Sequence, residues 1–261
     1  MKLSRLLLAL ALSCVGGCAT ERAVFGLAPG QQSAPDTRPK TKTVKLPRTW
    51  PFVVQASAAE PDLPPWTVPS AKPARMLKEA LSPTELFKKV GPAVYTVLGQ
   101  RGAHEVGSQG SAVAVSSKEA ITNCHVVAQA KVITLANAGA TLRAELIAAD
   151  RKTDRCTLRV LDGELEPVPG VRDYTALEVG EAVFTIGSPK GLVNTLGQGV
   201  LSGLRRSEDD VEYIQITAPV SEGSSGGGVF DDRGNLIGVA TFTIRDGQNL
   251  NFAIAASRFW R

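Results

Sequence analysis

The chain lacks several features that would place it in other protein classes. None of its 261 residues belongs to an apolar run of about 20 residues, the length that a membrane-spanning helix needs. It also has no internal repeat, metal-ligand cluster or phosphate-binding glycine loop, so we expect no cofactor and no metal. Aromatic residues are few, with 3 Trp, 3 Tyr and 8 Phe against 25 Gly. This composition favours turns and aliphatic strands over a helical bundle.

A basic folded surface is missing as well. The formal net charge is +4, yet residues 84–261 hold 18 Lys and Arg against 20 Asp and Glu. Nucleic acid is therefore not an expected partner. The positive charge gathers in residues 38–48, which contain five basic residues and no acid. Such an arm fits an anionic membrane surface, and it fits a solvated linker equally well.

The N-terminus has the pattern of an export signal. Lys2 and Arg5 precede an apolar run over residues 6–12, and small residues follow, so residues 1–17 are interpreted as a signal peptide. Residues 15–18 (VGGC) resemble a bacterial lipobox, in which Cys18 is lipidated and becomes the mature N-terminus. This predicts an exported, periplasmic lipoprotein that is anchored to the membrane. The alternative is an ordinary cleaved signal with an incidental cysteine.

Proline marks the next segment as a linker. Eleven of the 16 prolines lie between residues 18 and 83, without helical or strand periodicity. Residues 18–81 are therefore expected to be a basic tether, largely unstructured. Its aromatic residues Trp50, Phe52 and Trp66 could dock on the folded domain or on another subunit.

A folded domain is expected over residues 82–261. Ser82, Pro83 and Glu85 provide an N-cap, a first-turn proline and a capping box, which predict a short helix to about Val90. Short β-type runs separated by Gly, Asp and Asn follow, at residues 94–98, 112–115, 131–135, 142–147, 157–161, 182–186, 211–216, 228–230, 236–242 and 250–254. Their spacing is typical of a closed or sandwiched antiparallel all-β fold.

Serine-based acyl transfer needs a hydroxyl, a neighbouring imidazole and an acid that fixes the imidazole tautomer. The chain has two histidines. His104 lies in the polar residues 101–109, interpreted as a surface loop, whereas His125 follows a strand in residues 122–127 (TNCHVV). His125 is thus the better candidate base.

The candidate nucleophile is Ser225, in residues 221–227 (SEGSSGG), where glycines allow a tight turn that presents backbone N–H groups. Alone, such a segment is more often a flexible loop. An acid before a strand, such as Asp154, is more often solvated. The order His125, Asp154, Ser225 favours catalysis, because it is the chain order of the chymotrypsin triad.

With these residues assembled, residues 84–258 resemble the HtrA/Deg family of trypsin-like serine proteases. The segments that carry the resemblance are 85–92 (ELFKKVGP), 107–127, 186–192 (IGSPKGL), 223–227 (GSSGG) and 251–254 (NFAI). The resemblance implies two six-stranded antiparallel β-barrels of the trypsin/chymotrypsin type with a short N-terminal helix. The chain stops soon after residue 254, so no PDZ domain is expected.

The same resemblance assigns roles to individual residues. Ser225 would be the nucleophile, His125 the general acid/base and Asp154 the residue that orients it. The backbone N–H groups of Gly223 and Ser225 would form the oxyanion hole. The chain departs from the family pattern at Ser221, Glu222, Ser224, Gly228 and Cys124. These departures put the geometry of the oxyanion loop in question.

The implied function is a serine endopeptidase of the bacterial cell envelope that cleaves proteins or peptides through an acyl-enzyme. Quality control of exported proteins is the implied role, and a homo-oligomer the implied assembly. Pro219 occupies the position, six residues before the nucleophile, where trypsin-type specificity places an acid, so a small apolar pocket is expected. The alternatives are an inactive trypsin-fold holdase and a structural lipoprotein.

A disulfide between Cys124 and Cys156 follows from the triad. If Asp154 hydrogen-bonds His125, the two segments lie close together, and each cysteine is within two residues of one of them. Cys156 is expected on a strand with its side chain on the same face as Asp154. An exported protein lies in a compartment where such a bond persists. The alternative is a pair of buried free thiols.

Overall fold

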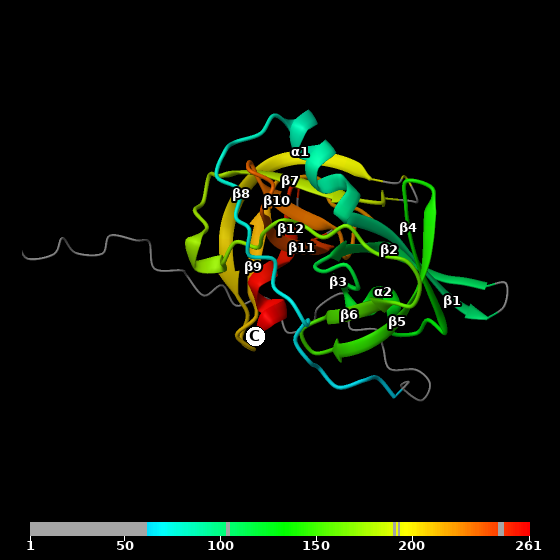
Figure 1. The fold of residues 1–261 in the computed structure, drawn as a ribbon. Helices are drawn as coiled ribbons and strands as arrows, with labels where there is room; N and C mark the ends of the chain where they lie inside the picture. Colours follow the sequence, from blue (N-terminus) through cyan, green and yellow to red (C-terminus); the bar gives the residue numbers. More distant parts are fainter. Residues whose placement is uncertain (1–61, 103–104, 190–191, 193, 245–247) are drawn as a thin grey trace, which may run out of the picture. The chain divides into compact units, whose positions relative to one another are not determined.

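The computed structural model describes residues 62–261, apart from residues 103–104, 190–191, 193 and 245–247. Twelve strands in this described part form two closed six-stranded barrels (Figure 1). All paired strands within each barrel are antiparallel, which confirms the predicted all-β, double-barrel fold.

The first barrel has the strand order β1-β2-β3-β6-β5-β4 and closes by pairing β1 with β4. The strands, drawn in shades of green in Figure 1, are β1 Val94–Gly102, β2 Glu105–Ala114, β3 Glu119–Thr122, β4 Val132–Asn137, β5 Ala140–Asp150 and β6 Arg155–Val160. A four-residue helix, α2 Cys124–Val127, lies between β3 and β4. Register shifts in the β1–β2 and β5–β6 ladders mark bulges, which bend strands enough for a sheet to close on itself.

The second barrel has the order β10-β11-β12-β9-β8-β7, closed by pairing β10 with β7. Its strands, yellow to red in Figure 1, are β7 Ala182–Gly187, β8 Thr195–Arg206, β9 Glu212–Ile216, β10 Gly228–Asp231, β11 Leu236–Thr243 and β12 Asn251–Ala255. The described residues also form three short 3-10 helices, η1 Gly91–Ala93, η2 Tyr174–Ala176 and η4 Ala256–Trp260.

Helix α1 Pro83–Val90 begins where the sequence predicts. The Ser82 hydroxyl accepts from the backbone N–H of Glu85 (3.3 Å), and a Glu85 carboxylate oxygen accepts from the backbone N–H of Ser82 (2.9 Å). Leu86 and Val90 are completely buried and pack into an apolar cluster that includes residues of both barrels. Helix α1 thus helps to join the barrels, and each barrel has a further apolar cluster of its own.

Residues 62–81 contact the barrels, although they were predicted to be unstructured tether; we call them the strap (cyan in Figure 1). Its backbone forms an isolated bridge between Ala74 and Gly170, and the backbone N–H of Leu77 donates to the side chain of Asn235 (2.8 Å). Trp66 packs on Phe259 of the same chain, which answers where this aromatic residue docks. Ordered structure therefore begins before residue 82.

Two further sequence interpretations need correction. Residues 101–109, interpreted as a loop, belong largely to the β1–β2 hairpin; the position of His104 lies outside the described residues. The sequence pattern also gave no run for β3 or β8. Strand β8 contains Gly197, Gly199 and Gly203, which mask its pattern; at Gly199 a Cβ would lie 2.2 Å from the backbone N of Ala218.

Candidate active site

His125 and Asp154 lie together in the first barrel. Asp154 accepts two hydrogen bonds from the histidine, from its backbone N–H to Oδ1 (2.9 Å) and from its ring at Nδ1 to Oδ2 (2.8 Å). Both side chains are 29% exposed, so the pair is open to a substrate. A carboxylate acceptor at Nδ1 favours the tautomer that carries its proton there. Nε2 is then the basic nitrogen, as a general base requires.

Helix α2 places the histidine. It starts directly after Asn123, which adopts an extended backbone and donates its side-chain amide to the carbonyl of Asp154 (3.1 Å). The backbone N–H of Cys124 donates to the same carbonyl (3.4 Å). The chain around His125 is therefore held to the aspartate by main-chain contacts as well as by the carboxylate.

Asp154 itself occupies the turn between β5 and β6, with a backbone φ of +57°. Asp tolerates this left-handed region better than most residues. Asp150 supports the turn by accepting from the backbone N–H of Thr153 (3.2 Å), from its hydroxyl, and from Nη2 of Arg155 (2.8 Å). Burial opposes ionisation of Asp150, but these hydrogen bonds outweigh it and lower the pKa of its carboxyl group.

Thr241 joins this pair to Ser225 and was missed by the sequence reasoning. From β11 of the second barrel, its hydroxyl donates to Asp154 Oδ2 (3.0 Å), and its carbonyl accepts from the hydroxyl of Ser225 (3.2 Å). Asp154 and Ser225 are thus both hydrogen-bonded to the same residue, Thr241. No local motif marks Thr241, because its position depends on how the two barrels pack.

Ser225 lies in the second of two consecutive turns, which share Ser224. The N–H of Ser224 donates to the carbonyl of Ser221 (2.9 Å), and the N–H of Gly227 donates to that of Ser224 (2.9 Å). The third residue of each turn is a glycine with positive φ, Gly223 at +88° and Gly226 at +85°. A type II turn requires positive φ at this position. The glycines around Ser225 therefore build an ordered loop rather than a flexible one.

Ser111, on β2, anchors this loop to the first barrel and was also missed. Its backbone N–H donates to the carbonyl of Ser225 (2.8 Å), and its hydroxyl donates to the carbonyl of Gly223 (2.8 Å). Gly110, next to Ser111, lies between Val126 and the carbonyl of Ser225, where a Cβ would come within 3.0 Å of each. Gly110 therefore lies closely between the serine loop and the helix that carries His125.

The candidate oxyanion donors belong to the same loop. Among the described residues, neither the backbone N–H of Gly223 nor that of Ser225 donates to a protein acceptor. Ser224, which replaces the family's Asn, has its hydroxyl turned back to accept from the N–H of Ser221 (3.3 Å). Backbone N–H groups that are free to donate can bind a carbonyl oxygen on which negative charge develops.

Cys124 and Cys156 are joined by a disulfide bond with a Cα–Cα distance of 4.9 Å. The expected reason for their proximity was incomplete, since Asp154 lies in a turn and not on the strand of Cys156. Cys156 is instead paired across the sheet with Thr122, two residues before Cys124. Both cysteines are at most 2% exposed. The predicted lipidation site, Cys18, lies outside the described residues.

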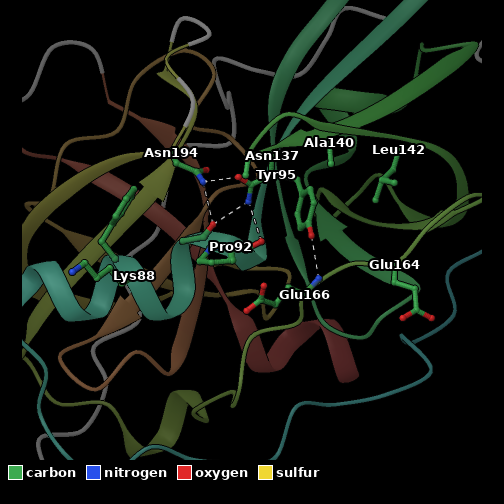
Figure 2. Close-up of a pocket in the computed structure, with 12 residues that line it drawn as sticks. Lys88, Pro92, Tyr95, Asn137, Ala140, Leu142, Glu164, Glu166 and Asn194 are labelled. Carbon is green, nitrogen blue, oxygen red and sulfur yellow. Dashed lines mark hydrogen bonds between the residues drawn. The ribbon is translucent and has the colours of Figure 1, made fainter.

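A cavity of about 350 Å³ lies apart from these residues (Figure 2). It is bordered by α1, the β4–β5 turn and the segments around Glu166 and Asn194. Asn137 donates its side-chain amide to the carbonyls of Pro92 (2.9 Å) and Val94 (3.0 Å), and it accepts from the amide of Asn194 (3.0 Å). These contacts tie the β7–β8 connection to the first barrel. None of the candidate catalytic residues lines this cavity.

Membrane-spanning helices and metal-ligand clusters are both absent from the described residues. No helix there is long and apolar enough to cross a membrane. No group of three or more His, Cys, Asp and Glu side chains within that part of the chain is placed to hold a metal ion.

Comparison with known families fits this geometry. Residues 110–239 match the model described as Trypsin-like peptidase domain, and this stretch includes His125, Asp154 and Ser225. The described double barrel therefore has the trypsin-like fold. Its curated relatives include the putative serine protease HhoB of Synechocystis sp., 34% identical over 158 residues, and a probable periplasmic serine endoprotease, DegP-like, of Halomonas elongata, 37% identical over 163 residues.

These alignments cover 58% and 59% of the chain, and 38% and 34% of the two relatives. The chain thus spans little more than a third of the length of the curated relatives that it matches. Among solved structures, it is similar to an HtrA-type protease with tripeptide, at 28% identity and a TM-score of 0.62, covering 68% of this chain and 61% of the other. It is also similar to the serine endoprotease from Yersinia pestis, at 25% identity and a TM-score of 0.59, covering 69% and 65%.

Proposed function

We propose that this protein is a serine endopeptidase in which Ser225 is the nucleophile, His125 the general acid/base and Asp154 the orienting acid. The observation that carries the proposal is the pair of hydrogen bonds that Asp154 accepts from the backbone and the ring of His125. The match to the peptidase-domain model and the similarity to HtrA- and DegP-like serine proteases support it.

The reaction proceeds through an acyl-enzyme. The Ser225 oxygen attacks the substrate carbonyl while its proton passes to Nε2 of His125, and the N–H groups of Gly223 and Ser225 bind the oxyanion. Asp154 stabilises the imidazolium that forms. His125 then delivers the proton to the leaving amine, and water releases the acyl group by the same steps. The hydroxyl of Ser225 must first leave the carbonyl of Thr241, to which it donates in this structure.

A fluorophosphonate probe tests the proposal, because it labels only an activated serine. Wild type is expected to be labelled and Ser225→Ala not. Ser224→Ala is the matched control, since it removes the adjacent hydroxyl and is expected to leave labelling intact. If Ser224→Ala lost labelling and Ser225→Ala kept it, the nucleophile would be Ser224 and the proposed assignment would be wrong.

A second candidate function is a holdase that binds unfolded chains without cleaving them. The hydrogen bond from Ser225 to Thr241 favours it, since the nucleophile's hydroxyl is directed at a carbonyl acceptor in this structure. Wild-type protein that suppresses aggregation of an unfolded protein, yet is never labelled by the probe, would support the holdase over the peptidase.

The chain is proposed to act outside the cytoplasm, in the periplasm, as a lipoprotein anchored through Cys18. The signal-like residues 1–17 and the DegP-like relatives named as periplasmic support this placement. Metabolic labelling with an alkyne fatty acid is expected to tag wild type and not Cys18→Ser. Equal labelling of both proteins would rule out Cys18 as the lipidation site. Quality control of exported proteins and assembly into a homo-oligomer are proposed with it.

Cleavage is proposed after small apolar residues and not specifically after Lys or Arg. Pro219 occupies the position where trypsin-type specificity needs an acid, and its carbonyl accepts from the hydroxyl of Thr185 (3.3 Å). Glu222, near the expected rim, is the one nearby acid of the loop, and it is exposed. A profile of cleaved peptides dominated by Lys or Arg on the acyl side would contradict the proposal.

A further inference from the structure

Arg155 follows Asp154 directly and holds the turn that carries this acid. It is 5% exposed and lies at the start of β6. Its Nε donates to the Thr153 hydroxyl (2.7 Å), and its Nη2 donates to Asp150 Oδ2 (2.8 Å). One guanidinium group therefore braces both the residue before Asp154 and the acid that begins the turn.

The other edge of the guanidinium reaches the last residues of the chain. Nη1 donates to the carbonyl of Arg258 and to that of Arg261 (3.2 Å). Four of the five N–H groups of Arg155 are thus used on the first barrel and the C-terminal segment together. Such a fork has little freedom to turn, because any rotation would leave buried donors without acceptors.

The strap covers the face of the same guanidinium. The ring of Trp66 lies 4.5 Å from Arg155 Cζ, in cation–π geometry, and its other contact is edge-on with Phe259 (centroids 6.2 Å apart). The carbonyl of Pro64 accepts from the backbone N–H of Ala149 (3.2 Å), which fixes the strap beside the last residues of β5. The guanidinium of Arg155, which braces the aspartate turn, thereby lies between the strap and the C-terminal segment.

This arrangement differs from the other contacts that hold the strap. Ser70 donates twice to Glu119, through its backbone N–H (2.7 Å) and its hydroxyl (2.9 Å), and Lys72 pairs with Asp173 (3.0 Å). Those contacts lie on other elements and do not include the aspartate turn. Asp154 also has φ +57°, a conformation that needs support from its surroundings. Arg155 contacts this turn directly, and Trp66 contacts Arg155.

We propose that Arg155, held under Trp66 and against the C-terminal carbonyls, is a positioning residue for Asp154 and through it for His125. The part of the strap around Trp66 then helps to set the geometry of the active site, whereas the part around Ser70 only fastens the strap to the first barrel. This inference rests on the proposed peptidase function. Arg155 acts through the aspartate turn and does not touch the substrate.

The test compares four variants with wild type. Arg155→Met removes the donors and the charge at similar length, Arg155→Lys keeps a charge without the planar fork, and Trp66→Leu uncovers the guanidinium. Ser70→Ala is the matched control, because it loosens the same strap away from the turn. Steady-state kinetics on a fluorogenic peptide are measured at a temperature where thermal melts show every variant folded.

Arg155→Met is expected to lower kcat about 10- to 100-fold with KM changed less than about threefold, as for a displaced catalytic group. Trp66→Leu is expected to lower kcat by a smaller factor, and Arg155→Lys to retain part of the activity lost in Arg155→Met. Ser70→Ala should keep wild-type kcat even where it lowers the melting temperature. Equal kcat in all variants, or equal losses in Ser70→Ala and Trp66→Leu, would overturn the proposal.

A second readout needs no activity and so separates this inference from the proposed function. In ¹⁵N-histidine-labelled protein, the Nδ1 proton of His125, assigned with His104→Ala, should resonate far downfield because it is hydrogen-bonded to Asp154. Arg155→Met and Trp66→Leu are expected to shift or remove this resonance, and Ser70→Ala to leave it. An unchanged resonance in a folded Arg155→Met would refute the positioning role even if wild type proved inactive.

Discussion

At the scale of the residue, the candidate site depends on a glycine next to Ser225. This residue is Gly226, since a Cβ there would lie 1.9 Å from the carbonyl oxygen of Ser111 and 2.4 Å from the Thr122 hydroxyl. Its φ of +85° adds backbone strain for any other residue. Steric exclusion and conformation therefore both require glycine behind the nucleophile.

Gly226→Ala is expected to lower the free energy of unfolding by more than about 4 kcal/mol, an exceptional loss for one residue. Gly139→Ala is the matched control, because Gly139 has nearly the same φ, +84°, with nothing within 4 Å of its would-be Cβ. It is expected to lose only about 1–2 kcal/mol, the cost of the left-handed conformation. Urea denaturation measures both, and similar losses would show that conformation alone matters at Gly226.

Residues of the candidate site differ in how far the sequence could predict them. His125, Asp154 and Ser225 each lie in a recognisable local motif, so their order along the chain pointed to them. Thr241 and Arg155 have no such motif, because their roles arise where distant segments meet: a strand of the second barrel for one, the strap and the C-terminus for the other. Local sequence carries no record of those contacts.

At the scale of the element, the disulfide joins α2 to β6 on either side of the His125–Asp154 pair. It closes a loop of 32 residues. Removing both cysteines as Cys124→Ala/Cys156→Ala is expected to lower the free energy of unfolding by about 3–4 kcal/mol in the chain-entropy model. Urea denaturation of the double variant and of reduced wild type measures this. Recovery of both cysteines as alkylatable thiols from unfolded, non-reduced protein would rule the bond out.

The strap is held to β3 by a buried carboxylate. Burial of Glu119 opposes its ionisation, but hydrogen bonds from Ser70 and Arg159 outweigh this and lower the pKa of Glu119 below its ordinary value. A carboxyl group with a lowered folded-state pKa stabilises the fold fully above its unfolded pKa. That stabilisation is lost as the pH falls through the folded value.

Glu119→Gln is therefore expected to melt at a lower temperature than wild type at pH 7, with the difference shrinking as the pH falls below about 4. Glu164→Gln is the control, because Glu164 is an exposed partner of Lys118 and should change the melting temperature little at either pH. Thermal melts between pH 3 and pH 7 decide the matter. A difference between Glu119→Gln and wild type that stayed constant with pH would contradict the role of the charge.

The elements themselves were predicted unevenly. Helix α1 was predicted because its start has a capping box, a local signal. Ten strands were predicted from short apolar runs. Strand β3 was expected only as the strand before His125 and had no apolar run of its own, because it begins with the charged Glu119. The hairpin residues 101–109 were missed because they are polar and contain glycine. The two six-stranded barrels were implied by the family resemblance, since spacing alone fitted a sandwich equally well.

At the scale of the described domain, the candidate site exists only where the two barrels meet. His125 and Asp154 come from the first barrel, while Ser225 and Thr241 come from the second. Hydrogen bonds from Thr241 to Asp154 and from Ser111 to the serine loop cross this boundary. Neither barrel alone could assemble the candidate site, because its residues come from both.

The most direct test of the central claim, that His125, Asp154 and Ser225 act as one catalytic unit, is the kcat of single and combined variants on fluorescein-labelled casein. Ser225→Ala and His125→Ala are each expected to lower kcat on the order of 10⁴- to 10⁶-fold, and the double variant to lose no more than either alone. His104→Ala should keep wild-type kcat. Near-normal activity in His125→Ala would contradict the account. A double variant whose loss in kcat equalled the product of the two single losses would contradict it as well.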